Sequence, residues 1–121
     1  MEIKGLPQIE GFDFAYAMDI FQDEEILKVI LVEFYNSLDE MCEKLDGLFN
    51  AIGEGDNLSS YRLEVHAFKS TSAAVGALEI SGQARLLEEA AIAGDVERIL
   101  CKHPLFMEDV KKHKERLRAI I

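Results

Sequence analysis

The sequence has little of the residues that break or cross-link a chain. Among its 121 residues there are two prolines, eight glycines and two cysteines. So few helix-breaking residues favour long, uninterrupted elements. Each apolar run is short and ends at charged residues, which excludes a membrane-spanning segment. The first residues, MEIKGLPQIEG, lack the apolar core of a signal peptide, so we expect a cytoplasmic protein.

Familiar catalytic and metal-binding patterns are also missing. Cys42 and Cys101 have no metal-type spacing, and we expect both to be reduced and buried. His103 and His113 are too far apart for a one-turn metal pair, so no metal site is expected. There is no glycine-rich phosphate loop and no Ser/His/Asp set. We therefore expect no autonomous kinase or phosphatase activity.

The charge is strongly one-sided. With 13 basic and 23 acidic residues the net charge is −10, which repels polyanions. Nucleic acid and anionic membranes are therefore excluded as expected partners. Hydrophobic residues make up 49% and charged residues 30%, a composition typical of globular domains. The length suits a single domain over residues 1–121, with its core in about 7–119.

Apolar residues recur at helical spacing, whereas the alternation of a half-buried strand is not sustained. The expected helices cover residues 12–21, 23–52, 59–75 and 78–93, with a last helix from Pro104 to the C-terminus. A short turn is expected over residues 96–101. Four long amphipathic helices with short links predict an all-α fold, an antiparallel four-helix bundle with a short additional N-terminal helix.

Details of the long helix and the helix after it can be predicted as well. The turn cluster GEGDN at 53–57 is expected to end the long helix, and Ser59 or Ser60 to cap the next one. The apolar residues expected to form the buried stripe of the long helix are Ile26, Val29, Ile30, Phe34, Leu38, Met41, Leu45 and Leu48.

The helix expected at 59–75 carries one histidine away from its core stripe. The residues within one narrow arc of the helical wheel, which should be buried, are Tyr61, Val65, Phe68, Ser72 and Val75. His66 lies roughly 140° from the centre of that arc and is expected to face solvent. The residues on its own face are Arg62, Lys69, Ser70, Ala73 and Ala77. Such small side chains allow another protein to approach closely.

An exposed imidazole beside a lysine suggests two alternatives. It is either an ordinary surface histidine or a nucleophile, since a neutral ring nitrogen can attack an electrophile near neutral pH. A phosphoryl group on that nitrogen would carry a charge of about −1.5 to −2. Lys69, one turn away, could stabilise this charge, and Arg62 is a second candidate.

The residues around His66 resemble a known family signature. His66-Ala67-Phe68-Lys69-Ser70, with Gly76 ten residues after the histidine, is similar to the signature of histidine-containing phosphotransfer (HPt) domains. That signature is His-x-Leu-Lys-Gly followed by a second glycine, so Phe68 and Ser70 depart from it. The stretches PQIEGFDFAYAMDIFQDEEILKVILVEFYNSL and EEAAIAGDVERI also resemble the family, and the resemblance covers about residues 7–119.

The resemblance implies a role for each site residue. His66 would be the phosphoacceptor through the ring nitrogen remote from the backbone, and Lys69 would stabilise the phosphoryl group. Glu88 would hydrogen-bond the near ring nitrogen and orient the imidazole, unless it is simply a solvated glutamate beside Glu89. Gly76 would allow close helix contact. The residues expected to form the docking surface are Arg62, Ser70, Ala73 and Ala77.

The resemblance also implies a function. The protein would be a phosphorelay intermediate that accepts a phosphoryl group from the aspartyl phosphate of a receiver domain and passes it to another receiver. Its expected partners are response-regulator receiver domains and a hybrid sensor histidine kinase. We expect a monomer without a cofactor of its own, with magnesium on the partner receiver. Two alternatives are a docking module of the same fold without phosphotransfer and a metal-binding helical bundle.

Overall fold

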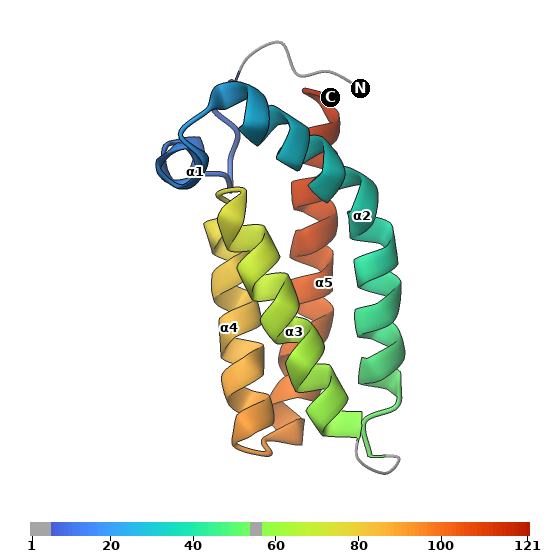
Figure 1. The fold of residues 1–121 in the computed structure, drawn as a ribbon. Coiled ribbons are helices and arrows are strands. Elements are labelled where there is room, and N and C mark those ends of the chain that lie inside the picture. The colour runs from blue at the N-terminus through green and yellow to red at the C-terminus, as the bar shows by residue number, and fades with distance from the viewer. Residues whose placement is uncertain (1–5, 54–56) are drawn as a thin grey trace.

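The computed structural model describes residues 6–53 and 57–121, and its regular structure is helical in these ranges (Figure 1). The helices are α1 (Phe14–Phe21), α2 (Glu24–Asn50), α3 (Asn57–Ala74), α4 (Leu78–Ile92) and α5 (Val96–Arg118). The four long helices form a bundle in which α3 packs against α2 and α4, and α5 packs against the same two helices. The short α1 lies at one end of the bundle. The predicted four-helix bundle with a short N-terminal helix is confirmed.

Aspartates begin three of the helices. The side chains of Asp13 and Asp95 accept hydrogen bonds from backbone N–H groups in the first turns of α1 and α5. Asp23 accepts two such bonds at the start of α2, where Glu24 and Glu25 add further negative charge. These contacts satisfy backbone donors that have no partner within the helix, and the charge is favourable at the positive end of the helix dipole. Local sequence therefore fixes where these helices start.

The core stripe predicted for α3 is confirmed. Tyr61, Val65, Phe68, Ser72 and Val75 are all buried. Phe68 meets Phe106 of α5 edge to face, with the ring centroids 5.3 Å apart. This is a preferred geometry for an aromatic pair. Because the stripe points into the bundle, the opposite face of α3, which carries His66, is left to solvent.

The stripe predicted for α2 is wrong in its first two turns. Ile26 and Val29 are 48% and 58% exposed, and Leu27 and Leu31 are buried instead. Apart from Lys28, every residue from 26 to 32 is apolar. Apolar spacing therefore fits more than one face in this segment, and the packing of α2 in the bundle decides between them.

Two predicted helix starts are also wrong. The segment 96–101, expected to be a turn, is helical, and α5 begins at Val96 with Pro104 in its interior. A proline inside a helix costs about 3 kcal/mol, and the burial of Ile99 and Phe106 on either side of it offsets this cost. Helix α3 begins at Asn57, two residues before the predicted serine cap. Residues 54–56 of the predicted turn cluster lie outside the described residues.

Gly76 joins α3 to α4 in contact with the segment that precedes α1. Its φ of +81° lies in the left-handed region. Its carbonyl accepts a hydrogen bond from the backbone N–H of Asp13 at 2.7 Å. A Cβ at position 76 would lie 2.3 Å from the backbone oxygen of Asp13. Because Gly76 has no side chain, it allows a close backbone contact, and this contact is with the segment that precedes α1.

Across residues 6–53 and 57–121, the helices fall short of the combined length and apolarity that a membrane span requires.

Candidate functional site

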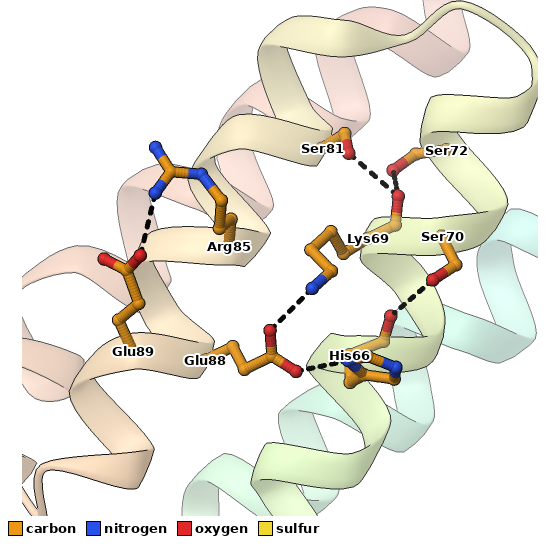
Figure 2. A network of polar contacts seen from close by, with 8 residues as sticks. All are labelled: His66, Lys69, Ser70, Ser72, Ser81, Arg85, Glu88 and Glu89. Carbon is orange, nitrogen blue, oxygen red and sulfur yellow. Dashed lines mark hydrogen bonds and ion pairs between the residues drawn. The ribbon is translucent and has the colours of Figure 1, made fainter.

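His66, Lys69 and Glu88 meet where α3 faces α4 (Figure 2). The side chain of His66 is 56% exposed. One oxygen of the Glu88 carboxylate is hydrogen-bonded to Nδ1 of His66, the ring nitrogen nearer the backbone. The other oxygen accepts a hydrogen bond from Nζ of Lys69 at 2.7 Å. A single carboxylate from α4 therefore holds two side chains that lie one turn apart on α3.

A serine hydroxyl links the two helices at the level of this site. Ser81 of α4 is buried, and its Oγ donates to the backbone carbonyl of Lys69 at 2.8 Å. The hydroxyl of Ser72 bonds within α3, mainly to the carbonyl of Phe68 at 2.7 Å and more weakly to that of Lys69 at 3.2 Å (Figure 2). Ser81 precedes Glu88 by seven residues, which places both on one face of α4. The bond from Ser81 thus helps to set the register of α4 against α3, and with it the position of Glu88.

The charge of Glu88 determines which nitrogen of His66 is free. The hydrogen bond from Lys69, and secondarily that with His66, lowers the pKa of Glu88 below its ordinary value, although burial acts in the opposite direction. Glu88 is therefore ionised at neutral pH, and an ionised carboxylate only accepts hydrogen bonds. Nδ1 of His66 must then carry the proton. In the neutral ring this leaves the lone pair on Nε2, the nitrogen remote from the backbone.

Glu88 and Glu89 have different environments. Glu88 is only 8% exposed, so the alternative that it is a solvated glutamate is wrong. Glu89 is exposed and pairs with Arg85 of its own helix at 2.8 Å. The neighbouring carboxylate is therefore not part of the contact with His66.

Three of the four predicted docking residues lie on the surface of α3. Ser70 is exposed, and its hydroxyl donates to the carbonyl of His66 at 3.3 Å. Arg62 and Ala73 are partly exposed. Ala77 is fully buried, so its prediction as a docking residue is wrong. Because α3 ends at Ala74, a helical wheel continued to residue 77 no longer describes the direction of the side chain.

Sequence reasoning missed two further features of this surface. Leu63 is 58% exposed on the turn of α3 before His66 and adds an apolar side chain beside it. The bond from Ser81 to α3 was also not foreseen, although its seven-residue spacing from Glu88 was a usable signal. A shallow pocket between α2 and α3, lined by Ile30, Ser37 and Thr71 among others, lies further along α3 from Leu63.

The other histidines and the cysteines lie in unrelated places. Within the described ranges, no group of three or more His, Cys, Asp or Glu side chains is arranged to hold a metal ion. His103 and His113 are both buried, in separate hydrogen-bonded contacts. Cys42 is half-buried, and burial raises the pKa of its thiol to about 11. Cys101 is exposed, so its predicted burial is wrong.

Comparison with known protein families places most of the chain in one of them. A family model described as Hpt domain matches residues 27–120, a range that contains His66, Lys69 and Glu88. This match confirms the resemblance found in the residues around His66. Neither a curated protein nor a solved structure matches the chain.

Proposed function

The chain belongs to the Hpt domain family, whose members are phosphotransfer modules of two-component systems, and on this basis we propose that it is a phosphorelay intermediate. It accepts a phosphoryl group on His66 from the aspartyl phosphate of one receiver domain and passes it to another receiver. The observation that carries the proposal is the Glu88 carboxylate, which binds Nδ1 of His66 and Nζ of Lys69 at once.

Each side chain has a distinct part in the proposed transfer. The Nε2 lone pair of His66 attacks the phosphorus, and the bond between phosphorus and the aspartyl oxygen breaks, which leaves the receiver with a free carboxylate. The ring keeps its proton on Nδ1 and becomes positively charged, and Glu88 stabilises that charge. Lys69, which Glu88 holds one turn from His66, offsets the negative charge of the phosphoryl oxygens. Magnesium, where transfer requires it, is held by the receiver domain.

The proposed docking surface surrounds His66 on α3. Ser70 and Ala73 let a receiver approach closely, and Leu63 supplies apolar contact. Arg62 has no ion-pair partner among residues 6–53 and 57–121 and is available to an acidic receiver surface. The partners in this proposal are the receiver domains of response regulators and of a hybrid sensor kinase. The protein acts as a cytoplasmic monomer without kinase or phosphatase activity of its own.

Labelling by a phosphorylated receiver tests the proposal. We expect His66→Gln to abolish transfer of radioactive phosphate from a phosphorylated receiver, because the only exposed imidazole among the described residues is removed. The label on the wild type should be lost in acid and retained in base, as expected of a phosphoramidate. Circular dichroism should show unchanged helix content, since His66 lies outside the core. A mutant labelled as fully as the wild type would refute the proposal.

The same assay distinguishes a phosphotransfer protein from the alternative, a docking module of the same fold without phosphotransfer. A module that only docks receivers would bind a phosphorylated receiver without becoming labelled. Binding of the receiver by both wild type and His66→Gln, with label on neither, would favour that function.

A further inference from the structure

A groove between α4 and α5 lies outside the proposed phosphotransfer site. Its volume is about 270 Å³. Its floor contains Leu87 and Phe106, which are buried, and its rim contains Leu86 and Leu105, which are 40% and 56% exposed. Large apolar side chains on both rims of a groove are a feature of surfaces that bind another protein segment.

Two unpaired cations line one end of this groove. Arg98 and Lys102 lie four residues apart on α5, and in the described part of the chain neither side chain forms an ion pair. Most other lysines and arginines of the described residues do, although acidic residues outnumber basic ones by 23 to 13. A positive end is therefore retained in an otherwise acidic protein.

At the opposite end of the groove, the polar side chains already have hydrogen-bond partners. Gln83 of α4 donates from its amide nitrogen to Asp109 of α5 at 2.9 Å. Along the groove, the Gln83–Asp109 contact at one end is followed by apolar side chains and then by the two unpaired cations. A ligand that matches this order has an apolar stripe with negative charge at one end only.

The groove and the phosphotransfer site use different faces of α4. Ser81 and Glu88 contact α3, whereas Gln83 and Leu86 line the groove with α5. An occupant of the groove therefore does not need to cover His66.

We propose that this groove binds an amphipathic helix of a partner protein, with its apolar stripe on Leu86 and Leu105 and its carboxylates at Arg98 and Lys102. The two cations are separated by four residues, a rise of about 6 Å along α5, which matches carboxylates one turn apart on the bound helix. Recognition of a helix through its apolar stripe in a groove is an established binding mode. The net charge of −10 disfavours an anionic membrane surface as the occupant.

Nuclear magnetic resonance of the full chain with two synthetic peptides tests this assignment. Both peptides are amphipathic helices with the same leucine stripe, and one carries glutamates where the other carries lysines. We expect the glutamate peptide to shift the backbone amide signals of Leu86, Lys102 and Leu105, and the lysine peptide to leave them in place. Reversing both charges, in Arg98→Glu/Lys102→Glu, should weaken binding of the glutamate peptide by about tenfold or more.

Lys111 provides the matched control on the same helix. It is exposed, forms no ion pair within the described ranges, and lies near Cys42 on the side of α5 that faces α2. Lys111→Glu makes the same change in net charge as either single reversal, Arg98→Glu or Lys102→Glu, but away from the groove. It should leave the affinity for the glutamate peptide unchanged, whereas each single reversal should weaken it. An equal loss in this variant would show that only overall charge matters and would overturn the proposal.

Other results would also overturn it. These are equal binding of the two peptides, signal shifts centred on α2 and α3, or self-association of the chain through the groove in sedimentation experiments. The result is independent of the phosphorelay function, because Arg98→Glu/Lys102→Glu should still be labelled on His66 by a phosphorylated receiver.

Discussion

At the scale of single residues, the position of Glu88 is the central feature of the site. Its carboxylate comes from a different helix than the histidine and the lysine that it contacts. It fixes the proton on Nδ1 of His66 and keeps Lys69 close to the ring. Groups that orient metal-ligating histidines in the same way contribute about 10- to 100-fold to metal affinity or activity, and we expect an effect of similar size for Glu88.

Replacing Glu88 by Gln should slow phosphotransfer to His66 by about tenfold or more. The amide removes the charge that stabilises the imidazole after attack, and it no longer requires a proton on Nδ1. Nitrogen chemical shifts of the imidazole should show one tautomer in the wild type and a mixture in the variant. Glu89→Gln is the control, because Glu89 pairs with Arg85 and not with His66. An unchanged tautomer in Glu88→Gln would remove Glu88 from the proposed mechanism.

The residues of the site differ in how far sequence could predict them. His66 and its outward direction follow from the helical wheel, because the core stripe of α3 is unambiguous. Glu88 came from resemblance alone, since its contact with His66 depends on the register between two helices. Ala77 was placed wrongly because the helix ends three residues before it. Such errors arise where a pattern is extended beyond the element that produces it.

At the scale of elements, the link between α3 and α4 determines how the two site-bearing helices are joined. Gly76 adopts a positive φ there, and its backbone touches that of Asp13. A side chain at this position would meet backbone atoms, which cannot move as the end of a flexible side chain can. The link therefore holds α3, α4 and the start of α1 together.

Gly76→Ala should lower the free energy of unfolding by about 3 kcal/mol, the cost of a left-handed alanine combined with the displacement of Asp13. Gly82→Ala should change the free energy of unfolding in the opposite direction. Gly82 lies within α4, where a Cβ would meet no atom within 4 Å, and alanine should stabilise the helix by about 0.5–1 kcal/mol. Urea denaturation of both variants measures the two changes. Equal effects in the two variants would contradict this account of Gly76.

The elements themselves were predictable where one signal dominated. The existence of all five helices follows from apolar periodicity and few breakers. The start of α5 did not follow, because a proline is common at the first position of a helix and Pro104 was read as such. The buried face of α2 near Ile26 did not follow either, since nearly every side chain there is apolar. Tertiary packing decides both cases.

At the scale of the whole molecule, a buried polar network connects three helices of the bundle. Nε2 of His103 in α5 donates to the Asp46 carboxylate of α2 at 2.9 Å, which leaves Nδ1 as an acceptor. The hydroxyl of Tyr61 in α3 donates to Nδ1 at 2.7 Å. The imidazole also stacks on Phe49, with the centroids 4.0 Å apart. In protonated His103 both ring nitrogens are donors, so the hydroxyl of Tyr61 could no longer donate to Nδ1.

This network predicts how the stability depends on pH. Burial lowers the pKa of His103 below its ordinary value, although Asp46 acts in the opposite direction. The unfolded chain therefore binds this proton more readily than the folded one, and the free energy of unfolding should fall as the pH decreases through about 6.5. Urea denaturation between about pH 7.5 and 5.5 covers this window, in which carboxylates remain largely ionised.

Two histidine variants test whether His103 causes this pH dependence of the stability. His103→Leu should be less stable by about 1–3 kcal/mol at neutral pH, because the buried hydroxyl of Tyr61 loses its partner, and its stability should vary less with pH. His66→Gln is the second variant, and the pH dependence that it retains does not come from the exposed histidine. If the stability of His103→Leu depends on pH as strongly as that of the wild type, the proton that causes this dependence binds to another group.

The way Lys69 is held has a consequence for conformational entropy. A free lysine side chain loses up to about 2 kcal/mol of rotamer freedom when it is fixed in one geometry. In this protein Glu88 already restrains the ammonium group, and Ser81 and Ser72 restrain the backbone from which the side chain extends. Most of that ordering therefore takes place when the chain folds. In the proposed transfer, a phosphoryl group that arrives at His66 meets a cation with little freedom left to lose.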